Sequence, residues 1–299
     1  MTCTGPETSV VDDCSVDVSP KRVAKRATSG ALTALRRGRT ISWTDPSGNL
    51  GNFLYNWLRA WRLQQEDHEA FALQTPAMTQ WLQVWPRLAQ QVTITRAGVR
   101  PFDVREIRST QCWGADYFPY HVEGFALQLL EELRDAVGPR STGPDRLVVN
   151  VRRGDFYTDY RERYAFDLIG YLRLAFDRSI RLGGRPNSIH VVSDDPVWCQ
   201  AHLAQFRSIA PLTFESEVRD PLRDLLTLTS APRLILTNST FGYWGAHLSN
   251  ALHGANHEHV VAPWFHDRST WFGAAYQLNP AWSIIRSIPG DWSVPVEGQ

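Results

Sequence analysis

The second half of this 299-residue sequence constrains the fold most, because short unbroken apolar segments alternate there with amphipathic stretches. The apolar segments have the composition of buried strands, and the stretches between them carry apolar residues at helical spacing. The expected strands are 147–151, 189–192, 234–236 and 259–262, and the expected helices are 168–176, 198–206, 222–229 and 241–252. Strands that are apolar on both faces and alternate with helices are typical of a parallel sheet covered on both sides. We therefore predict an α/β fold for this half.

A second α/β unit is predicted earlier in the chain. Residues 40–43 resemble a strand, a turn-rich run follows, and an apolar stripe at helical spacing begins at Phe53. Further helices are expected over 78–88 and 122–133, with a strand over 92–95. The run at 138–145 contains two Gly and two Pro, which is the clearest linker signal. We predict an N-terminal domain over 39–140 and a C-terminal domain over 145–299, with a ligand cleft between two Rossmann-like units.

The first 38 residues are predicted to form a flexible basic tail. Residues 1–40 contain seven basic and four acidic residues, without helical or strand periodicity. A basic tail can bind nucleic acid, but this one lacks interleaved aromatic residues, so we favour a solvated extension. Over the whole chain 31 basic residues balance 31 acidic ones, which argues against a nucleic-acid partner.

Other features restrict the class of protein. No apolar run is long enough to cross a membrane, and the N-terminus lacks the order of a signal peptide, so we expect a soluble, cytoplasmic protein. The four cysteines, Cys3, Cys14, Cys112 and Cys199, are scattered without a CxxC pair or clustered histidines. This spacing predicts reduced thiols and no structural zinc. No DxD pair is present to hold a metal-bound diphosphate, so no metal is expected.

The strongest local signal is the sequence NVRRGDFY, which begins at Asn150 where a buried strand should end. Ligands of α/β sheets bind at the carboxyl ends of strands, so Arg152 and Arg153 are placed to bind an anion. Side chains alternate along a strand, so one arginine should face the cleft while the other braces the loop. The alternative is a structural ion pair, for example between Arg153 and Asp155.

Two further segments carry polar residues at predicted strand ends. Asp194 and Asp195 could accept the N–H groups of guanine or ribose hydroxyls, although one of them is equally well placed to cap a helix that starts at Pro196. Ser239 and Thr240 open the last predicted helix, where free N–H groups favour a phosphate. They are also simply good N-cap residues.

Taken together and in this order, the segments resemble the α-1,2-fucosyltransferase family. Its members show GGLGNQ, HxRRGDY, SDDxxWC, DLxLM and NSSFSWWGAxL. The counterparts here are SGNLGNFLYN from Ser47, NVRRGDFY from Asn150, SDDPVWC from Ser193, DLLTL from Asp224 and NSTFGYWGAHLSN from Asn238. The resemblance extends over roughly residues 39–285, without the basic tail.

The resemblance implies a GT-B-like fold, GDP-fucose as donor, no metal, and inversion at the anomeric carbon. It implies donor binding by the residues Arg152, Arg153, Asp194, Asp195, Ser239 and Thr240. We expect Arg152 to stabilise the departing GDP. Asp155 is our choice of catalytic base, with Asp159 and Glu162 as alternatives. On this resemblance residues 39–140 should form the acceptor side of the cleft and residues 145–299 the donor-nucleotide side. Facing the cleft we expect Asn150 and the loop residues Gly48, Gly51 and Asn52.

The sequence departs from the family at three positions. Asn150 replaces the histidine of the motif, Asn49 stands where a paired glycine is expected, and Phe156 replaces a tyrosine. The expected activity is transfer of fucose to a glycan hydroxyl, α-1,2 to galactose. Three alternatives stay open: a transferase that uses another GDP-sugar or a small-molecule acceptor, a GDP- or glycan-binding protein without turnover, and, more distantly, a nucleic-acid binder acting through its tail.

Overall fold

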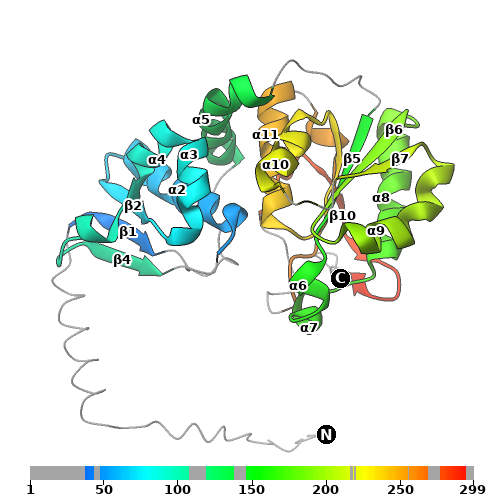
Figure 1. Ribbon diagram of the computed structural model, residues 1–299, viewed down its shortest axis with the longest axis horizontal. Coiled ribbons are helices and arrows are strands. Elements are labelled where there is room, and N and C mark those ends of the chain that lie inside the picture. Colours follow the sequence, from blue (N-terminus) through cyan, green and yellow to red (C-terminus); the bar gives the residue numbers. More distant parts are fainter. Residues whose placement is uncertain are drawn as a thin grey trace, which may run out of the picture.

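The computed structural model describes residues 38–43, 48–107, 119–137, 146–215, 218, 220–254, 256–268 and 277–293. The predicted tail over 1–38, except its last residue, and the predicted linker at 138–145 lie outside these ranges. Two separate parallel sheets form the frame of the molecule, as Figure 1 shows.

The first sheet has the order β3-β2-β1-β4, and all its strand pairs are parallel. Its strands are β1 (Thr40–Trp43), β2 (Ala70–Leu73), β3 (Thr93–Ile94) and β4 (Val104–Ile107). The helices of this half are α2 (Leu50–Gln65), α3 (Thr79–Val84), α4 (Pro86–Val92) and α5 (Pro119–Val137), with 3-10 turns at Pro76–Met78 and Arg96–Gly98.

The second sheet has six parallel strands in the order β10-β9-β8-β5-β6-β7. They are β5 (Arg146–Val151), β6 (Ser188–Ser193), β7 (Leu212–Phe214), β8 (Arg233–Ile235), β9 (Val260–Pro263) and β10 (Ser283–Ile285). The short pair β11 (Ser287–Ile288) and β12 (Trp292–Ser293) is antiparallel.

Helices cover both faces of this sheet. The longer ones are α8 (Leu168–Gly183), α9 (Pro196–His202), α10 (Pro221–Ser230) and α11 (Thr240–His253); the short ones are α6 (Gly154–Tyr157), α7 (Arg161–Tyr164) and the 3-10 turns Leu203–Ser208 and His257–His259. Successive residues of β5 enter different cores: Val149 packs with α8 and α9, and Val148 packs with α10 and α11. The α/β fold with two Rossmann-like units is therefore confirmed.

The two halves share one hydrophobic core. Trp244 and Leu248 of α11 and Leu225 of α10 are buried in the same cluster as the apolar residues of α2 and α5. Figure 1 shows α10 and α11 between the two sheets. The two halves are thus joined by buried apolar packing through α11.

Two predicted helices are interrupted. The helix expected over 78–88 is divided at Trp85, because Pro86 begins α4 and the residue before a proline disfavours helical backbone. The helix expected over 198–206 ends as an α-helix at His202 and continues as a 3-10 turn.

Candidate active site

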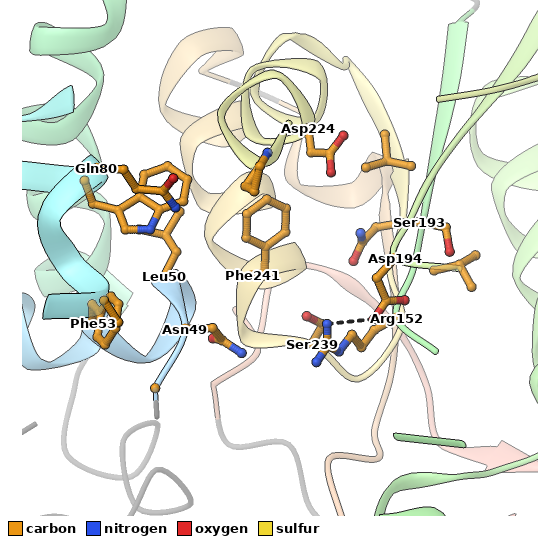
Figure 2. Close-up of a pocket in the computed structure, with 17 residues that line it drawn as sticks. Asn49, Leu50, Phe53, Gln80, Arg152, Ser193, Asp194, Asp224, Ser239 and Phe241 are labelled. Carbon is orange, nitrogen blue, oxygen red and sulfur yellow. Dashed lines mark ion pairs between the residues drawn. The ribbon is translucent and has the colours of Figure 1, made fainter. Parts of the chain in front are cut away.

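A cavity of about 250 Å³ lies between the two halves; it is drawn in Figure 2 and is here called the interdomain cavity. Its N-terminal wall consists of Gly48, Asn49, Leu50, Phe53, Ala77, Gln80 and Trp81. Its C-terminal wall consists of Asn150, Val151, Arg152, Val192, Ser193, Asp194, Pro221, Asp224, Ser239 and Phe241. The carboxyl ends of β5 and β6 therefore face the other half across this cavity, the usual place for a ligand in an open α/β sheet.

Arg152 is the cation of the cavity. It follows the last residue of β5, where its backbone N–H donates to Thr237 Oγ1 at 2.9 Å. Its guanidinium makes ion pairs with Asp194, at 2.7 Å, and with Asp155. The side chain is about one-fifth exposed. A guanidinium held by two carboxylates is fixed in orientation, and its remaining N–H groups can bind a phosphate.

Arg153 points elsewhere, as alternation along the strand predicts. Its guanidinium carbon lies 4.2 Å from the ring centre of Trp198 and 4.7 Å from that of Tyr157, and its Nε donates to Asp195 Oδ2 at 3.1 Å. Arg153 and Asp195 line neither cavity described here. This pair braces the loop that carries Arg152.

The two neighbouring carboxylates bind the protein itself. Asp195 caps α9 by accepting the backbone N–H of Trp198 at 3.1 Å, which is the alternative that the sequence left open for one of the two. Asp194 Oδ1 accepts the backbone N–H groups of Arg153, at 2.7 Å, and Gly154, at 3.2 Å, while its Oδ2 pairs with Arg152. Both side chains thus have positioning contacts already made within the loop.

Gly154 is required by this arrangement. A Cβ at this position would lie 2.6 Å from Asp194 Oδ2, closer than real Cβ contacts come. The glycine of the RRGD sequence therefore allows the carboxylate to reach the loop amides.

Ser239 and Thr240 lie at the start of α11. Ser239 is the N-cap residue with extended backbone, and its side chain makes no capping hydrogen bond. The N-terminus of this 14-residue helix therefore has unsatisfied N–H groups, and Ser239 and Arg152 line the same cavity. A cation and a helix N-terminus that face one space favour a phosphate there.

The first residues of the GNLGN sequence line the cavity, and the last ones contact α11 of the other half. Gly48 and Asn49 line the interdomain cavity. Asn52 accepts a hydrogen bond from Thr240 Oγ1 at 3.0 Å, and the carbonyl of Gly51 accepts one from Trp244 Nε1 at 3.1 Å. Gly51 and Asn52 therefore attach α2 to the first turn of α11.

A buried carboxylate lies at the end of the cavity away from Arg152. Figure 2 shows Asp224 at the opposite end from Arg152 and Ser239. Asp224 belongs to α10 and is buried, and Asn150 is buried on the same C-terminal wall with its Oδ1 unpaired among the protein atoms. In the sequence Asp224 stands out only as the first residue of the DLLTL motif. The signal that could have identified it is a carboxylate among leucines on an amphipathic helix.

A second cavity, of about 330 Å³, shares Asn49, Arg152 and Ser239 with the first. Asp155 and Thr240 line this second cavity and not the first, as does the buried His266. Burial lowers the pKa of His266 to about 4, so this imidazole is neutral at pH 7.

Two expected absences concern only the described ranges. Within them, no three His, Cys, Asp or Glu side chains gather in a way that would hold a metal ion. Nor does any helix there have the length and apolarity to cross a membrane. Cys199 is a free buried thiol, and burial raises its pKa to about 12. The other three cysteines lie outside the described residues.

Two parallel α/β sheets on either side of a cavity are the GT-B-like arrangement that the sequence predicted. Residues 121–261 match the family model described as Glycosyl transferase family 11. The resemblance expected from the sequence is therefore confirmed over this stretch, which contains Arg152, Asp194, Asp224 and Ser239.

Relatives agree with this assignment at low identity. The human galactoside alpha-(1,2)-fucosyltransferase 1 is 25% identical over 179 residues, covering 56% of this chain and 48% of the relative. The alpha-1,2-colitosyltransferase of Escherichia coli is 29% identical over 126 residues, covering 39% of this chain and 40% of the relative. The chain thus spans about half the length, or less, of these curated relatives.

Among solved structures, POFUT1 in complex with GDP is similar with a TM-score of 0.31 at 11% identity, covering 78% of this chain and 80% of that one. POFUT1 in complex with GDP-fucose gives a TM-score of 0.30 at 11% identity, covering 81% and 76%. The fold assignment therefore rests on the strand order and the cavity of the chain itself.

Proposed function

We propose that this protein transfers L-fucose from GDP-fucose to a hydroxyl of a glycan acceptor, α-1,2 to galactose, with inversion at the anomeric carbon. The observation that carries the proposal is the convergence of Arg152 and the N-terminus of α11 on the interdomain cavity, within the stretch that matches the family model. The name of the human relative supports both the sugar and the linkage.

Arg152 and the first turn of α11 would bind the donor's diphosphate. As the bond between the anomeric carbon and the diphosphate breaks, the electron pair stays on GDP, and negative charge increases next to Arg152. Preorganised cations and N–H groups of this kind contribute about 3–4 kcal/mol each to stabilising such charge. Asp194 and Asp155 hold the guanidinium before the donor arrives, so little reorganisation is needed.

The base of the donor is assigned to the opposite end of the cavity. The sequence led us to expect Asp194 or Asp195 at guanine, but Asp195 lines neither cavity and Asp194 lies against Arg152, at the phosphate end of the interdomain cavity. A carboxylate can accept the ring N–H and the exocyclic amine of guanine together, and Asp224 is the lining carboxylate at the end away from Arg152. Asn150 lines the same wall, with its Oδ1 buried against Gly242 of α11.

Inversion requires the acceptor hydroxyl to attack from the side opposite to GDP. Asp155 lines the second cavity, next to Arg152 but outside the interdomain cavity, and we assign it the acceptor's proton. The bond from the acceptor oxygen to the anomeric carbon then forms as the bond to the diphosphate breaks. Asp159 and Glu162 are exposed and line neither cavity. Because Arg152 supplies the positive charge, the reaction is expected to persist in excess EDTA.

A second candidate is transfer of a different sugar from the same kind of donor. The name of the Escherichia coli relative shows that a similar sequence transfers colitosyl. A third candidate, binding without turnover, follows from Asn150 at the position of the family's histidine. Both candidates keep the nucleotide site. The second differs in the sugar that is transferred, and the third lacks the chemical step.

Calorimetric titration separates these candidates. GDP, GDP-fucose and GDP-mannose are titrated into the wild type and Arg152→Ala, and the same donors are assayed for transfer and slow hydrolysis. Micromolar GDP binding that is lost in Arg152→Ala supports the donor site, and preference for one GDP-sugar identifies the donor. If the protein binds GDP but catalyses neither transfer nor hydrolysis, the third candidate, binding without turnover, is correct. If it has no affinity for any GDP species, the proposal is refuted.

A further inference from the structure

The second cavity lies on the other side of Arg152 from the nucleotide end of the interdomain cavity. The two cavities meet at Asn49, Arg152 and Ser239, whereas Asp155 belongs only to the second. A ligand in the second cavity would therefore reach the same guanidinium as the donor but from a different space. This is the relation that two substrates of a transfer reaction must have.

Aromatic side chains of α6, of α7 and of the N-cap residue of α7 form one wall of the second cavity; we call Phe156, Tyr160 and Tyr164 the aromatic wall. The rings of Phe156 and Tyr164 are stacked, with centres 4.1 Å apart and an angle of 11° between planes. Tyr160 stands edge-on to Tyr164, with ring centres 6.2 Å apart at 85°. Stacking fixes the rings, so the wall is preformed.

Tyr160 is the accessible member of this wall. It is 54% exposed, although a tyrosine buries apolar area when it can. No residue of the N-terminal half that lines this cavity is large and apolar, since these residues are Asn49 and Asn52. The wall is thus an apolar surface that faces hydrogen-bonding side chains across an open space.

The charges of the second cavity are compensated by the protein. Arg152 is paired with Asp155 and Asp194, and Arg163 is paired with Asp267 at 3.4 Å. The guanidinium of Arg163 also lies 4.9 Å from the ring centre of Tyr164. The ligand that fits is therefore neutral. It has one apolar face that packs on the aromatic wall, and hydroxyl groups that hydrogen-bond with Asp155, Asn49 and Asn52.

We propose that the aromatic wall is the acceptor subsite and takes a neutral pyranose, whose C–H face packs on Tyr160 while one hydroxyl reaches Asp155. This inference rests on the proposed transferase function. It changes the expectation that residues 39–140 form the acceptor side, because the wall comes from residues 154–164 of the C-terminal half.

The test measures sugar binding separately from donor binding. Binding of methyl β-galactopyranoside, methyl β-glucopyranoside and methyl β-N-acetylglucosaminide is followed by saturation-transfer NMR, with and without GDP, and GDP affinity is measured by calorimetry. The variants are Tyr160→Ala, Tyr160→Phe, which keeps the ring, and Phe102→Ala. Phe102 is 58% exposed and lies outside both cavities, so it is the matched control for loss of an exposed ring.

We expect the wild type to bind at least one glycoside, and Tyr160→Ala to weaken that binding by about tenfold or more, the effect of losing one buried aromatic contact. Tyr160→Phe and Phe102→Ala should bind the glycoside within about threefold of the wild type, a difference below 1 kcal/mol. GDP affinity should be equal in all four proteins.

Two results overturn the subsite: a wild type that binds GDP but none of the glycosides, and a Tyr160→Ala variant that binds the glycoside as well as the wild type does. A protein without GDP affinity refutes the transferase function instead. If a protein without GDP affinity still binds a glycoside, and Tyr160→Ala abolishes that binding, the second cavity is a pyranose site without the transferase function.

Discussion

Replacing Gly51 with alanine should push α2 away from the first turn of α11, where the two halves of the molecule approach closely. The added Cβ would lie 2.4 Å from Thr240 Oγ1, 2.5 Å from the carbonyl carbon of Thr240 and 2.6 Å from the nitrogen of Phe241. Two of these three atoms are backbone atoms of α11, which cannot move aside as a flexible side chain would. Helix α2 must therefore move away from α11.

The expected cost follows from the contacts at this joint. Overpacking of this kind costs about 1–3 kcal/mol. The separation also weakens the hydrogen bond of Asn52 with Thr240 and that of Trp244 with the carbonyl of Gly51, at about 1 kcal/mol each. We expect a loss of about 3 kcal/mol in the free energy of unfolding, which for a protein of 299 residues lowers the Tm by roughly 5 °C.

The assay is thermal denaturation together with GDP calorimetry. Because the contacted residues Thr240 and Phe241 directly follow Ser239 in the turn that faces the phosphates, GDP affinity should fall along with the Tm. Gly124→Ala in α5 is the control: its Cβ would meet only the outer edge of Trp61, at 3.2 Å, and alanine favours a helix. A Gly51→Ala protein with the Tm and the GDP affinity of the wild type would refute the close approach of α2 to α11.

Three further results are expected. Arg152→Lys should weaken GDP binding by about 10–100-fold because it loses paired hydrogen bonds. Arg153→Lys should instead lower the Tm and leave the GDP affinity unchanged. If calorimetry shows that both variants lose the same GDP affinity, the assignment of Arg152 to the donor and of Arg153 to the loop is wrong. Asp155→Asn should reduce kcat for transfer by about 10²–10⁴-fold, and a kcat close to that of the wild type would assign the proton to another group. Burial lowers the pKa of His247 to about 3, so this imidazole is neutral in the folded protein and takes up a proton on unfolding below its ordinary pKa of 6.5. The free energy of unfolding should therefore fall as the pH drops below that value, by about 2 kcal/mol from this group near pH 5. Denaturant titrations of the wild type and His247→Asn at neutral pH and near pH 5 measure this, and an equal pH dependence in both proteins would show that His247 does not contribute.

The alternation of apolar strands and helices was enough to predict the four central strands of the second sheet, β9, β8, β5 and β6, because these strands are mostly buried. The short strands β2 and β4 of the first sheet and the edge strands β7 and β10 of the second were missed, since three or four residues give little periodicity. Position within the strand was also enough to predict that Arg152 and Arg153 would diverge. Their partners come from β6, which only the fold brings beside β5.

The roles of Asp194 and Asp195 could not be predicted from the sequence alone. Asp194 and Asp195 have the residue type that guanine requires, and they end a strand beside the cavity. Only the structure shows that loop amides and arginines already occupy their oxygens. Asp224 lies on a helix rather than at a strand end, so the rule that ligands bind at strand ends does not indicate it.

Helix α11 couples the site to the packing of the whole molecule. One part of it covers the second sheet through Tyr243, and another is buried against α2 and α5 through Trp244 and Leu248. Its first turn carries Ser239 and Thr240 to the two cavities. A shift of the N-terminal half therefore moves the phosphate-facing turn directly, without any change in the arginine loop. Substitutions in the N-terminal half should for this reason alter donor affinity when they reach the contact of α2 with α11, and leave it unchanged when they fall on the first sheet.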